Sequence, residues 1–301
     1  MIEAADPSRA RTAPSARSGF SLRLGRWLGV VPFLLFTAAF LLIPTIRMIV
    51  GSFQDANGNF TLDNYSDFGS KIIVNAYTTS IEISLVTAVA AAIFGFLLAY
   101  AVISGGLPRP IRAAVMTFSG VASNFAGIPL ALAFIFTIGR AGFVTMLLKG
   151  IGIDPYQGGF NLYSKIGLEI VYFYFQLPLM VLIIAPAIDG LRAEWREAAA
   201  NLGASNAQFW RSVALPVLMP SILASVMLLF GNAFGAQATA YQLTGGLINL
   251  VTLVIGDQLS GDVLHNPGKG LALAVGMIAV MAVALAGYAL LQRRAERWRK
   301  R

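Results

Sequence analysis

Long apolar runs constrain this chain more than any other feature of its sequence. Six of them have the length, roughly 20 residues, that an α-helix needs to cross about 30 Å of hydrocarbon. They lie at about residues 27–50, 77–103, 111–138, 168–188, 213–234 and 271–291. The runs are too continuous for the alternation of a barrel strand, and helices satisfy their own backbone in lipid. We therefore predict an all-α polytopic membrane protein with six transmembrane helices.

The composition supports a membrane protein and excludes some chemistry. Hydrophobic residues make up 57% of the chain and charged residues 12%, with a mean hydropathy of +0.71, outside the range of soluble domains. The chain has no cysteine, so disulfides and thiolate chemistry are excluded. The net charge of +8 comes from arginines that flank the apolar runs, which indicates topology. We expect contact with membrane lipid and none with nucleic acid.

The basic residues are unevenly distributed among the connections, which predicts sidedness. Of the 22 lysines and arginines, 16 lie at the two ends and in the second and fourth connections. They are Arg9, Arg11, Arg17, Arg23, Arg26, Arg109, Arg112, Arg192, Arg196, Arg211, Arg293, Arg294, Arg297, Arg299, Lys300 and Arg301. Loop aspartates gather in the other connections instead. The positive-inside rule then places both termini and residues 189–212 in the cytoplasm.

The ends of the chain flank one transmembrane domain, expected at residues 27–292. Residues 1–26 are rich in Ser, Ala, Pro and Arg, and we expect a disordered basic cytoplasmic tail. The apolar run that follows is too long for the core of a signal peptide, so it is interpreted as an uncleaved first span. Residues 293–301 are expected to form a basic cytoplasmic C-terminus.

A polar stretch, residues 193–212, separates the fourth and fifth apolar runs and is here called the elbow. Its alanines and glutamates predict a short helix from about Ala193 to Leu202. Gly203 follows where a helix commonly ends in a left-handed residue. Ser205 or Asn206 can cap a second helix, and the aromatic pair at 209–210 could anchor the elbow at the membrane interface. The residues alone leave open whether this surface packs on its own bundle or binds another protein.

The spacing of the elbow resembles a known motif. It is similar to the EAA motif of the membrane subunits of binding-protein-dependent ABC importers. The matching residues are Glu197-Ala198-Ala199, Gly203, Val213 and Leu215-Pro216, with Val213 in place of the usual Ile. The resemblance implies the type I (MetI-like) importer permease bundle. It also implies that the elbow is the coupling helix, which docks on a cytoplasmic ATPase. The expected ATPase-coupling residues are Arg196, Glu197, Ala198, Ala199, Gly203, Leu215 and Pro216.

The resemblance also implies partners. They are an ATP-binding cassette ATPase dimer, a second permease subunit that makes a heterodimer, and an extracytoplasmic solute-binding protein, all at the cell membrane of a prokaryote. The chain itself lacks a phosphate-binding loop, since Gly268-Lys269-Gly270 has neither the upstream glycine nor the Ser or Thr. The single histidine, His265, suggests no zinc site. We expect no catalytic residue, metal or cofactor.

Polar side chains inside apolar runs are costly and indicate a function. The candidates for the translocation path are Asn124, Gln176, Asn232, Gln237 and Glu82. Four of these candidates also have an alternative role. Asn124 adjoins a predicted packing face, which consists of Ser119, Ser123 and Gly127. Gln176 and Asn232 could bond a neighbouring helix, and Glu82 could reach interfacial water.

The identity of the solute has only a weak signal. The run FGAQATAYQLTGG (234–246) resembles the permease branch for polyamines and related small charged solutes, although sugar-importer permeases carry a similar Thr-Gly-Gly turn. A secondary transporter or channel is the main alternative, and it would predict inverted repeats and intramembrane ion pairs. An integral-membrane enzyme is the other.

Overall fold

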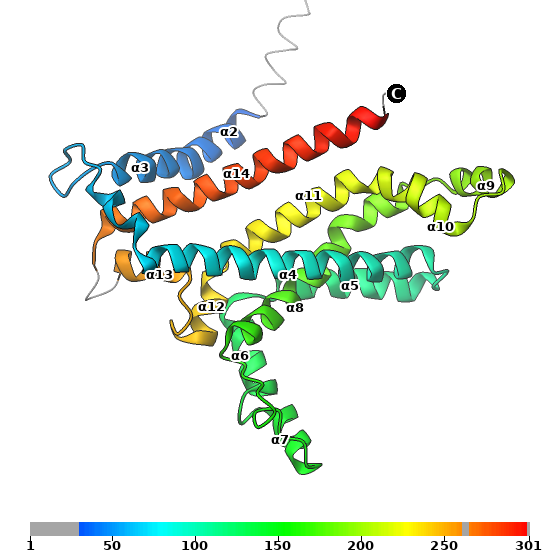
Figure 1. Cartoon of the computed structure of the whole chain (residues 1–301), viewed down its shortest axis with the longest axis horizontal. Coiled ribbons are helices and arrows are strands. Elements are labelled where there is room, and N and C mark those ends of the chain that lie inside the picture. Colours follow the sequence, from blue (N-terminus) through cyan, green and yellow to red (C-terminus); the bar gives the residue numbers. More distant parts are fainter. Residues whose placement is uncertain (1–29, 261–264, 300–301) are drawn as a thin grey trace, which may run out of the picture. The chain divides into compact units, whose positions relative to one another are not determined.

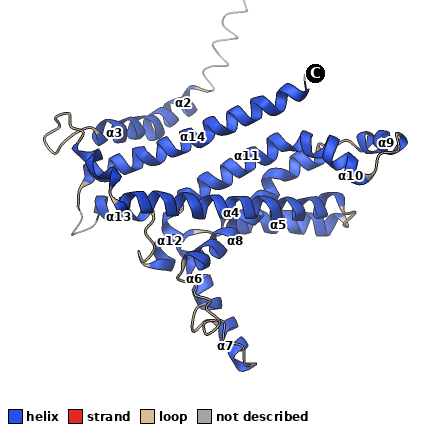
Figure 2. Cartoon of the chain, in the orientation of Figure 1, coloured by secondary structure: helices blue, strands red, loops and turns tan. Residues whose placement is uncertain are grey.

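A computed structural model describes residues 30–260 and 265–299, with the side chains of the last helix described as far as Gln292. The expected tail at 1–26 lies outside the described residues. The described elements are helices (Figure 2), apart from one isolated antiparallel bridge between Gln54 and Phe60. Contacts divide the chain into two units, Met1–Gly51 and Ser52–Arg301.

The first unit contains one apolar helix that is interrupted by a π-helical turn. It consists of α2 (Val31–Thr37), the π-helical η1 (Ala38–Leu42) and α3 (Ile43–Ser52). Together they span 22 residues, long enough to cross a membrane, as the sequence predicts. Pro44 is the second residue after η1. Because proline has no N–H and its ring crowds the carbonyl four residues earlier, the regular bonding pattern cannot continue there.

Four long helices form the framework of the second unit (Figure 1). They are α4 (Lys71–Ser104), α8 (Lys165–Asp189), α11 (Leu215–Phe234) and α14 (Pro267–Arg299). Helix α4 packs against both α8 and α11, and α14 packs against α11. In the residues that the structure describes, six segments are long and apolar enough to cross a membrane, in agreement with the predicted number.

Small residues on α4 allow α8 to approach closely. Ala88, Ala92, Gly95 and Ala99 recur every three or four residues on one buried face of α4. A Cβ at Gly95 would lie 2.7 Å from Cβ of Met180 and 2.9 Å from the carbonyl oxygen of Leu177 on α8. Close backbone approach at small residues is a typical way for helices to associate in lipid, where no hydrophobic force favours contact.

The predicted third span, 111–138, is wrong as a single helix. The structure has α5 (Arg109–Asn124), a bend at Phe125 and Ala126, and then α6 (Gly127–Ile138), which leads away from α4 (Figure 1). A continuous helix would require the residue at 129 to donate its N–H to the carbonyl of residue 125, and Pro129 has none. The packing face expected from Ser119 to Gly127 is therefore interrupted, since Gly127 has a positive φ of 72°.

The segments between the long helices of the second unit contain short helices. They are η2 (Asp63–Gly69), α7 (Phe143–Gly150), α12 (Gln237–Thr244) and α13 (Val251–Ser260). Gly245 and Gly246 form a turn at the end of α12, with φ of 57° and 84°. Helix α13 follows this turn. The Thr239 hydroxyl of α12 accepts a 2.9 Å hydrogen bond from the Gly127 N–H, which fixes the start of α6.

Candidate functional site

The first arm of the elbow is a short helix with a complete C-terminal cap. Helix α9 (Ala193–Asn201) ends at Leu202, and Gly203 follows with φ of 77°. The Gly203 N–H bonds the Ala200 carbonyl and the Ala204 N–H bonds the Ala199 carbonyl, both at 2.9 Å. These two bonds define a Schellman motif, which satisfies carbonyls that the helix end leaves open. The predicted helix and its left-handed glycine are confirmed.

The second arm begins with a capping box and continues into the membrane span. The Ser205 hydroxyl accepts the Gln208 N–H at 3.3 Å, and the Gln208 side chain accepts the Ser205 N–H at 2.7 Å. Helix α10 (Asn206–Phe209) then runs through the π-helical η3 (Trp210–Ala214) into α11. The π turn precedes Pro216 in the same way that η1 precedes Pro44. The arms of the elbow are thus fixed locally at both ends.

The elbow offers an exposed surface. Helix α9, all of which the structure describes, buries none of its residues, and both Glu197 and Ala198 are exposed. Leu202, at the tip, has 87% of its surface exposed, although it is a large apolar residue. A concavity of about 410 Å³ lies between the two arms. Its lining consists of Ala199, Leu202, Gly203, Ala204, Gln208, Phe209, Ser212 and Val213.

The C-terminal end of the elbow packs on α4 through its aromatic pair. Phe209 is buried at 7% exposure. Trp210 meets Tyr100 edge to face, with ring centroids 4.7 Å apart, and Phe96 in the same way at 6.2 Å. The pair therefore binds the elbow to its own bundle, a contact that residue spacing could not show because the partners lie about a hundred residues earlier.

An ion pair lies just before the N-terminal end of the elbow. Asp189, the last residue of α8, accepts hydrogen bonds from Nη2 of Arg112 on α5, at 2.8 Å to Oδ1 and 2.6 Å to Oδ2. On the sequence alone, Arg112 indicates only topology. Nothing local in the sequence pairs two residues that are 77 positions apart.

Gln176, a candidate for the translocation path, lies in the interior of the subunit. Its side chain is 0% exposed, and its Nε2 donates a 2.7 Å hydrogen bond to the Thr87 hydroxyl on α4. This placement agrees with the alternative that the amide bonds a neighbouring helix. Among the described residues, its Oε1 has no hydrogen-bond partner.

The other amide candidates lie on the surface of the subunit. Asn232 is exposed near the end of α11, and Gln237 is exposed at the start of α12, close to Gly256 of α13. Asn124 is also exposed, and its Nδ2 donates a 2.8 Å hydrogen bond to the Gly120 carbonyl in the last turn of α5. All three are therefore available to a neighbouring chain or to solute.

Glu82 has a partner that the sequence analysis missed. Its carboxylate lies 2.5 Å from Nζ of Lys165, at the start of α8, and 59% of the Glu82 side chain is exposed. Glu169 lies one turn further along α8 and interacts electrostatically with both Lys165 and Glu82, so two carboxylates and one ammonium group lie close together here. The available signal was Lys165 itself, which follows Ser164 just before the fourth apolar run, but pairing across helices requires the fold.

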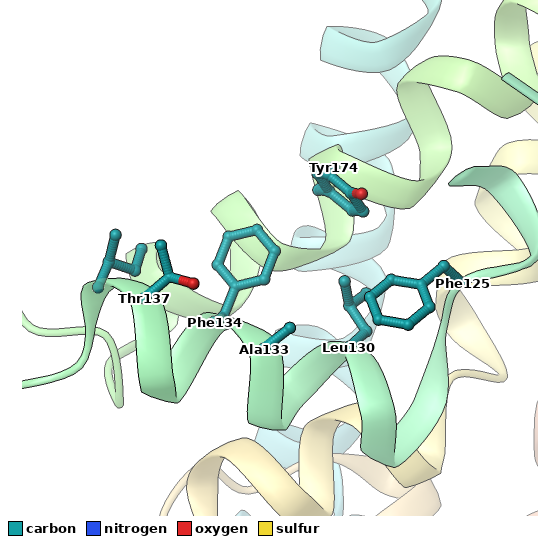
Figure 3. Close-up of a pocket in the computed structure, with 7 residues that line it drawn as sticks. Phe125, Leu130, Ala133, Phe134, Thr137 and Tyr174 are labelled. Carbon is teal, nitrogen blue, oxygen red and sulfur yellow. The ribbon is translucent and has the colours of Figure 1, made fainter. Parts of the chain in front are cut away.

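An apolar pocket of about 250 Å³ lies where α6 diverges from α8 (Figure 3). Its lining is Phe125, Leu130, Ala133, Phe134, Thr137, Ile138 and Tyr174. The rings of Phe134 and Tyr174 meet edge to face across it, with centroids 5.4 Å apart. A lining that is almost entirely apolar suits a hydrocarbon group and offers little to a polar solute.

Lys269 forms an ion pair with Asp67 of η2, and His265 is exposed. Within the described residues, no group of three His, Cys, Asp or Glu side chains could hold a metal ion.

A family model matches most of the second unit. Residues 91–297 match the family described as "Binding-protein-dependent transport system inner membrane component". The matched region contains the elbow and more than half of the chain.

Two curated relatives illustrate the range of the family. The chain is 26% identical over 231 residues to the "Sulfate transport system permease protein CysT" of Salmonella typhimurium, covering 76% of each chain. It is 27% identical over 259 residues to the "Spermidine/putrescine transport system permease protein PotB" of Haemophilus influenzae, covering 83% of this chain and 87% of the relative.

Two solved structures share the fold. A chain of a bacterial ABC transporter "involved in the import of the acidic polysaccharide alginate" superposes with a TM-score of 0.71 at 16% identity, covering 91% of this chain and 97% of that one. The alginate transporter in complex with a periplasmic protein gives a TM-score of 0.68 at 17% identity, covering 91% and 96%. The described architecture is thus that of an ABC importer permease, and this multi-pass, non-catalytic membrane subunit belongs to the family of binding-protein-dependent transport system inner membrane components.

Proposed function

We propose that this chain forms one half of the translocation path of an ATP-driven importer, and that a separate ATPase binds its elbow. The observation that carries the proposal is that α9 is capped at its C-terminus yet buries none of its residues. A rigid helix that exposes small side chains, a carboxylate and an apolar tip is suited to insertion into a groove of another protein. The proposed contacts are Arg196, Glu197, Ala198, Ala199 and Gly203, with Leu215 and Pro216 carrying the elbow into α11.

The elbow would act mechanically. It connects α8 to α11, and both of these helices pack on α4. Closure of an ATPase dimer would displace the elbow and with it the two helices that it joins. The bundle would then change between inward-open and outward-open states, an example of rigid-body switching. This requires both termini and the elbow in the cytoplasm, as the distribution of arginines predicts.

The translocation path would lie between this subunit and a second permease subunit, which we propose to be a different chain. Residues that line such a path are exposed in a single subunit. Asn124, Asn232, Gln237 and Glu82 meet this condition, whereas Gln176 does not. An extracytoplasmic solute-binding protein would deliver the solute to the outer short helices.

We propose a small charged solute, with a polyamine as the first candidate. The run at 234–246 and the 27% identity to the spermidine/putrescine permease support a polyamine. The sulfate permease is similar at 26%, so sulfate is the second candidate. Uptake of labelled spermidine and labelled sulfate by cells with and without the intact gene discriminates between them.

The proposed ATPase contact is tested by Glu197→Lys. We expect the ATPase encoded with this gene to co-purify at least about tenfold less well with the variant, because a reversed charge at a desolvated contact leaves a group unpaired. Asp154→Lys, a charge reversal in an outer connection, is the matched control and should co-purify normally. Unchanged co-purification and uptake in Glu197→Lys would contradict the proposal.

A further inference from the structure

We infer that the elbow is held to the α4–α5 hairpin at two points, and that the Arg112–Asp189 pair is a positioning contact through which elbow movement reaches the α5–α6 bend. The inference rests on the proposed function, in which an ATPase moves the elbow. Beyond that function, the inference states by which contacts the movement of the elbow reaches the other helices of the bundle.

The first point is the ion pair at the start of the elbow. Each of its charges lies at the helix end that its sign disfavours, since Asp189 ends α8 and Arg112 lies in the first turn of α5. A carboxylate is favourable near a helix N-terminus and a cation near a C-terminus, so neither helix gains from its own charge. The two close contacts between Nη2 and the carboxylate oxygens, 2.6 and 2.8 Å, offset that cost.

Stability alone does not account for this pair. Both side chains are partly exposed, 39% for Arg112 and 48% for Asp189, and exposed pairs contribute about 1 kcal/mol or less. The position of the pair in the fold matters more than the stability that it contributes. Asp189 precedes the first residue of α9, Ala193, by only four positions, so the pair ties the start of the elbow to α5.

The second point is the aromatic contact at the end of the elbow. Trp210 packs edge to face against Tyr100 and Phe96, with interplanar angles of 88° and 87°. Further along, Ala214 is fully buried. These contacts tie the end of the elbow to α4. Because only residues 105–108 connect α4 to α5, both points lie on one helical hairpin.

Helix α5 can carry movement from the first point to the bend. It packs along α8 and is continuous from Arg109 to Asn124, about 24 Å at 1.5 Å per residue. The bend at its far end is two residues long and leads to Gly127, which is bonded to Thr239 of α12. A rigid helix followed by a short bend is the type of element that converts a shift at one site into a rotation at another. Gln237, a proposed path residue, begins the same helix α12.

The test is a charge exchange in the full complex. Arg112→Asp and Asp189→Arg are made singly and together, and uptake per ATP hydrolysed is measured in proteoliposomes with co-purified ATPase. We expect each single variant to lower this ratio at least about fivefold and the double variant to restore it to within about twofold. Lys149 and Asp154 form a partly exposed pair at 3.5 Å in an outer connection, and their charge reversals serve as the control, with an unchanged ratio.

The absence of cysteine allows a second, covalent test. In Arg112→Cys/Asp189→Cys, uptake should be low and should recover when a short bis-maleimide joins the two thiols. Normal uptake per ATP in the single variants would overturn the inference, as would loss without recovery in the charge exchange or after cross-linking. Loss of ATPase co-purification in the single variants would also overturn it, by showing that the pair shapes the docking surface. Failure of the proposed function is separate, since it is shown by normal co-purification in Glu197→Lys.

Discussion

Gln176 on α8 donates a hydrogen bond to the hydroxyl of Thr87 on α4, at 2.7 Å, in the interior of the subunit. The Thr87 hydroxyl in turn donates to the Ile83 carbonyl at 2.8 Å, so its capacity is used in both directions. Among the buried side-chain nitrogen and oxygen atoms that the structure describes, only the Gln176 Oε1 has no hydrogen-bond partner. The amide therefore acts as a link between two helices.

Replacing Gln176 by Met should change stability little. The variant loses one hydrogen bond, worth about 0.6 kcal/mol between membrane helices, and removes a buried acceptor without a partner. We expect thermal unfolding in detergent close to that of the original protein and uptake within about twofold. Gln176→Glu should lower the melting temperature clearly, because it buries a carboxyl group. Loss of uptake in a stable Gln176→Met variant would instead support a role in the path.

Gly95→Ala should destabilise the bundle. The new methyl group would meet Cβ of Met180 at 2.7 Å and the Leu177 carbonyl at 2.9 Å, so α4 and α8 must separate. Overpacking of this kind costs about 1–3 kcal/mol. Gly120→Ala is the matched control, since its Cβ would meet no atom within 4 Å. In mixed micelles, the free energy of unfolding should be lower for Gly95→Ala than for Gly120→Ala. Equal values for the two variants would show that the helices are not closely packed at Gly95.

Gly203→Ala should weaken ATPase binding through the backbone. The φ of 77° at this position costs an L-residue with a side chain about 1–2 kcal/mol. Gly203→Asn should retain more ATPase in co-purification, because Asn tolerates the left-handed region better. Gly190→Ala is the control near the other end of the elbow, where φ is −74°. Equal losses for Ala and Asn at 203 would point to side-chain size at the interface in place of backbone conformation.

Asn232→Leu should reduce uptake while ATPase co-purification stays normal. Asn232 is exposed near the end of α11, and an apolar side chain there cannot hydrogen-bond a polar solute. The neighbouring Leu228, 52% exposed on the same helix, offers the control Leu228→Met. Initial uptake rates should fall about fivefold or more for Asn232→Leu, a loss comparable to an unpaired polar contact. Normal rates would remove Asn232 from the proposed path.

Local features of the elbow could be predicted because each depends on residues close in the chain. Gly203 ends α9 since only a glycine adopts its φ without strain, and Ser205 caps α10 through a residue three positions away. The number of spans likewise follows from the length of apolar runs, which the bilayer thickness sets. The motif carried by Glu197, Ala198 and Ala199 pointed to the family for the same reason.

Contacts between distant segments were decided only by the tertiary structure. Residues 113–138 contain no charged side chain, so the third span reads as continuous. Pro129 interrupts the backbone bonding near Phe125, but the direction in which α6 leaves α8 depends on tertiary contacts such as the bond between Gly127 and Thr239. The orientation of Gln176 depends on which face of α8 meets α4. The pairing of Arg112 with Asp189 joins residues 77 positions apart. A one-dimensional pattern records which side chains are polar, but packing determines which of them face each other, and that decides what each can do.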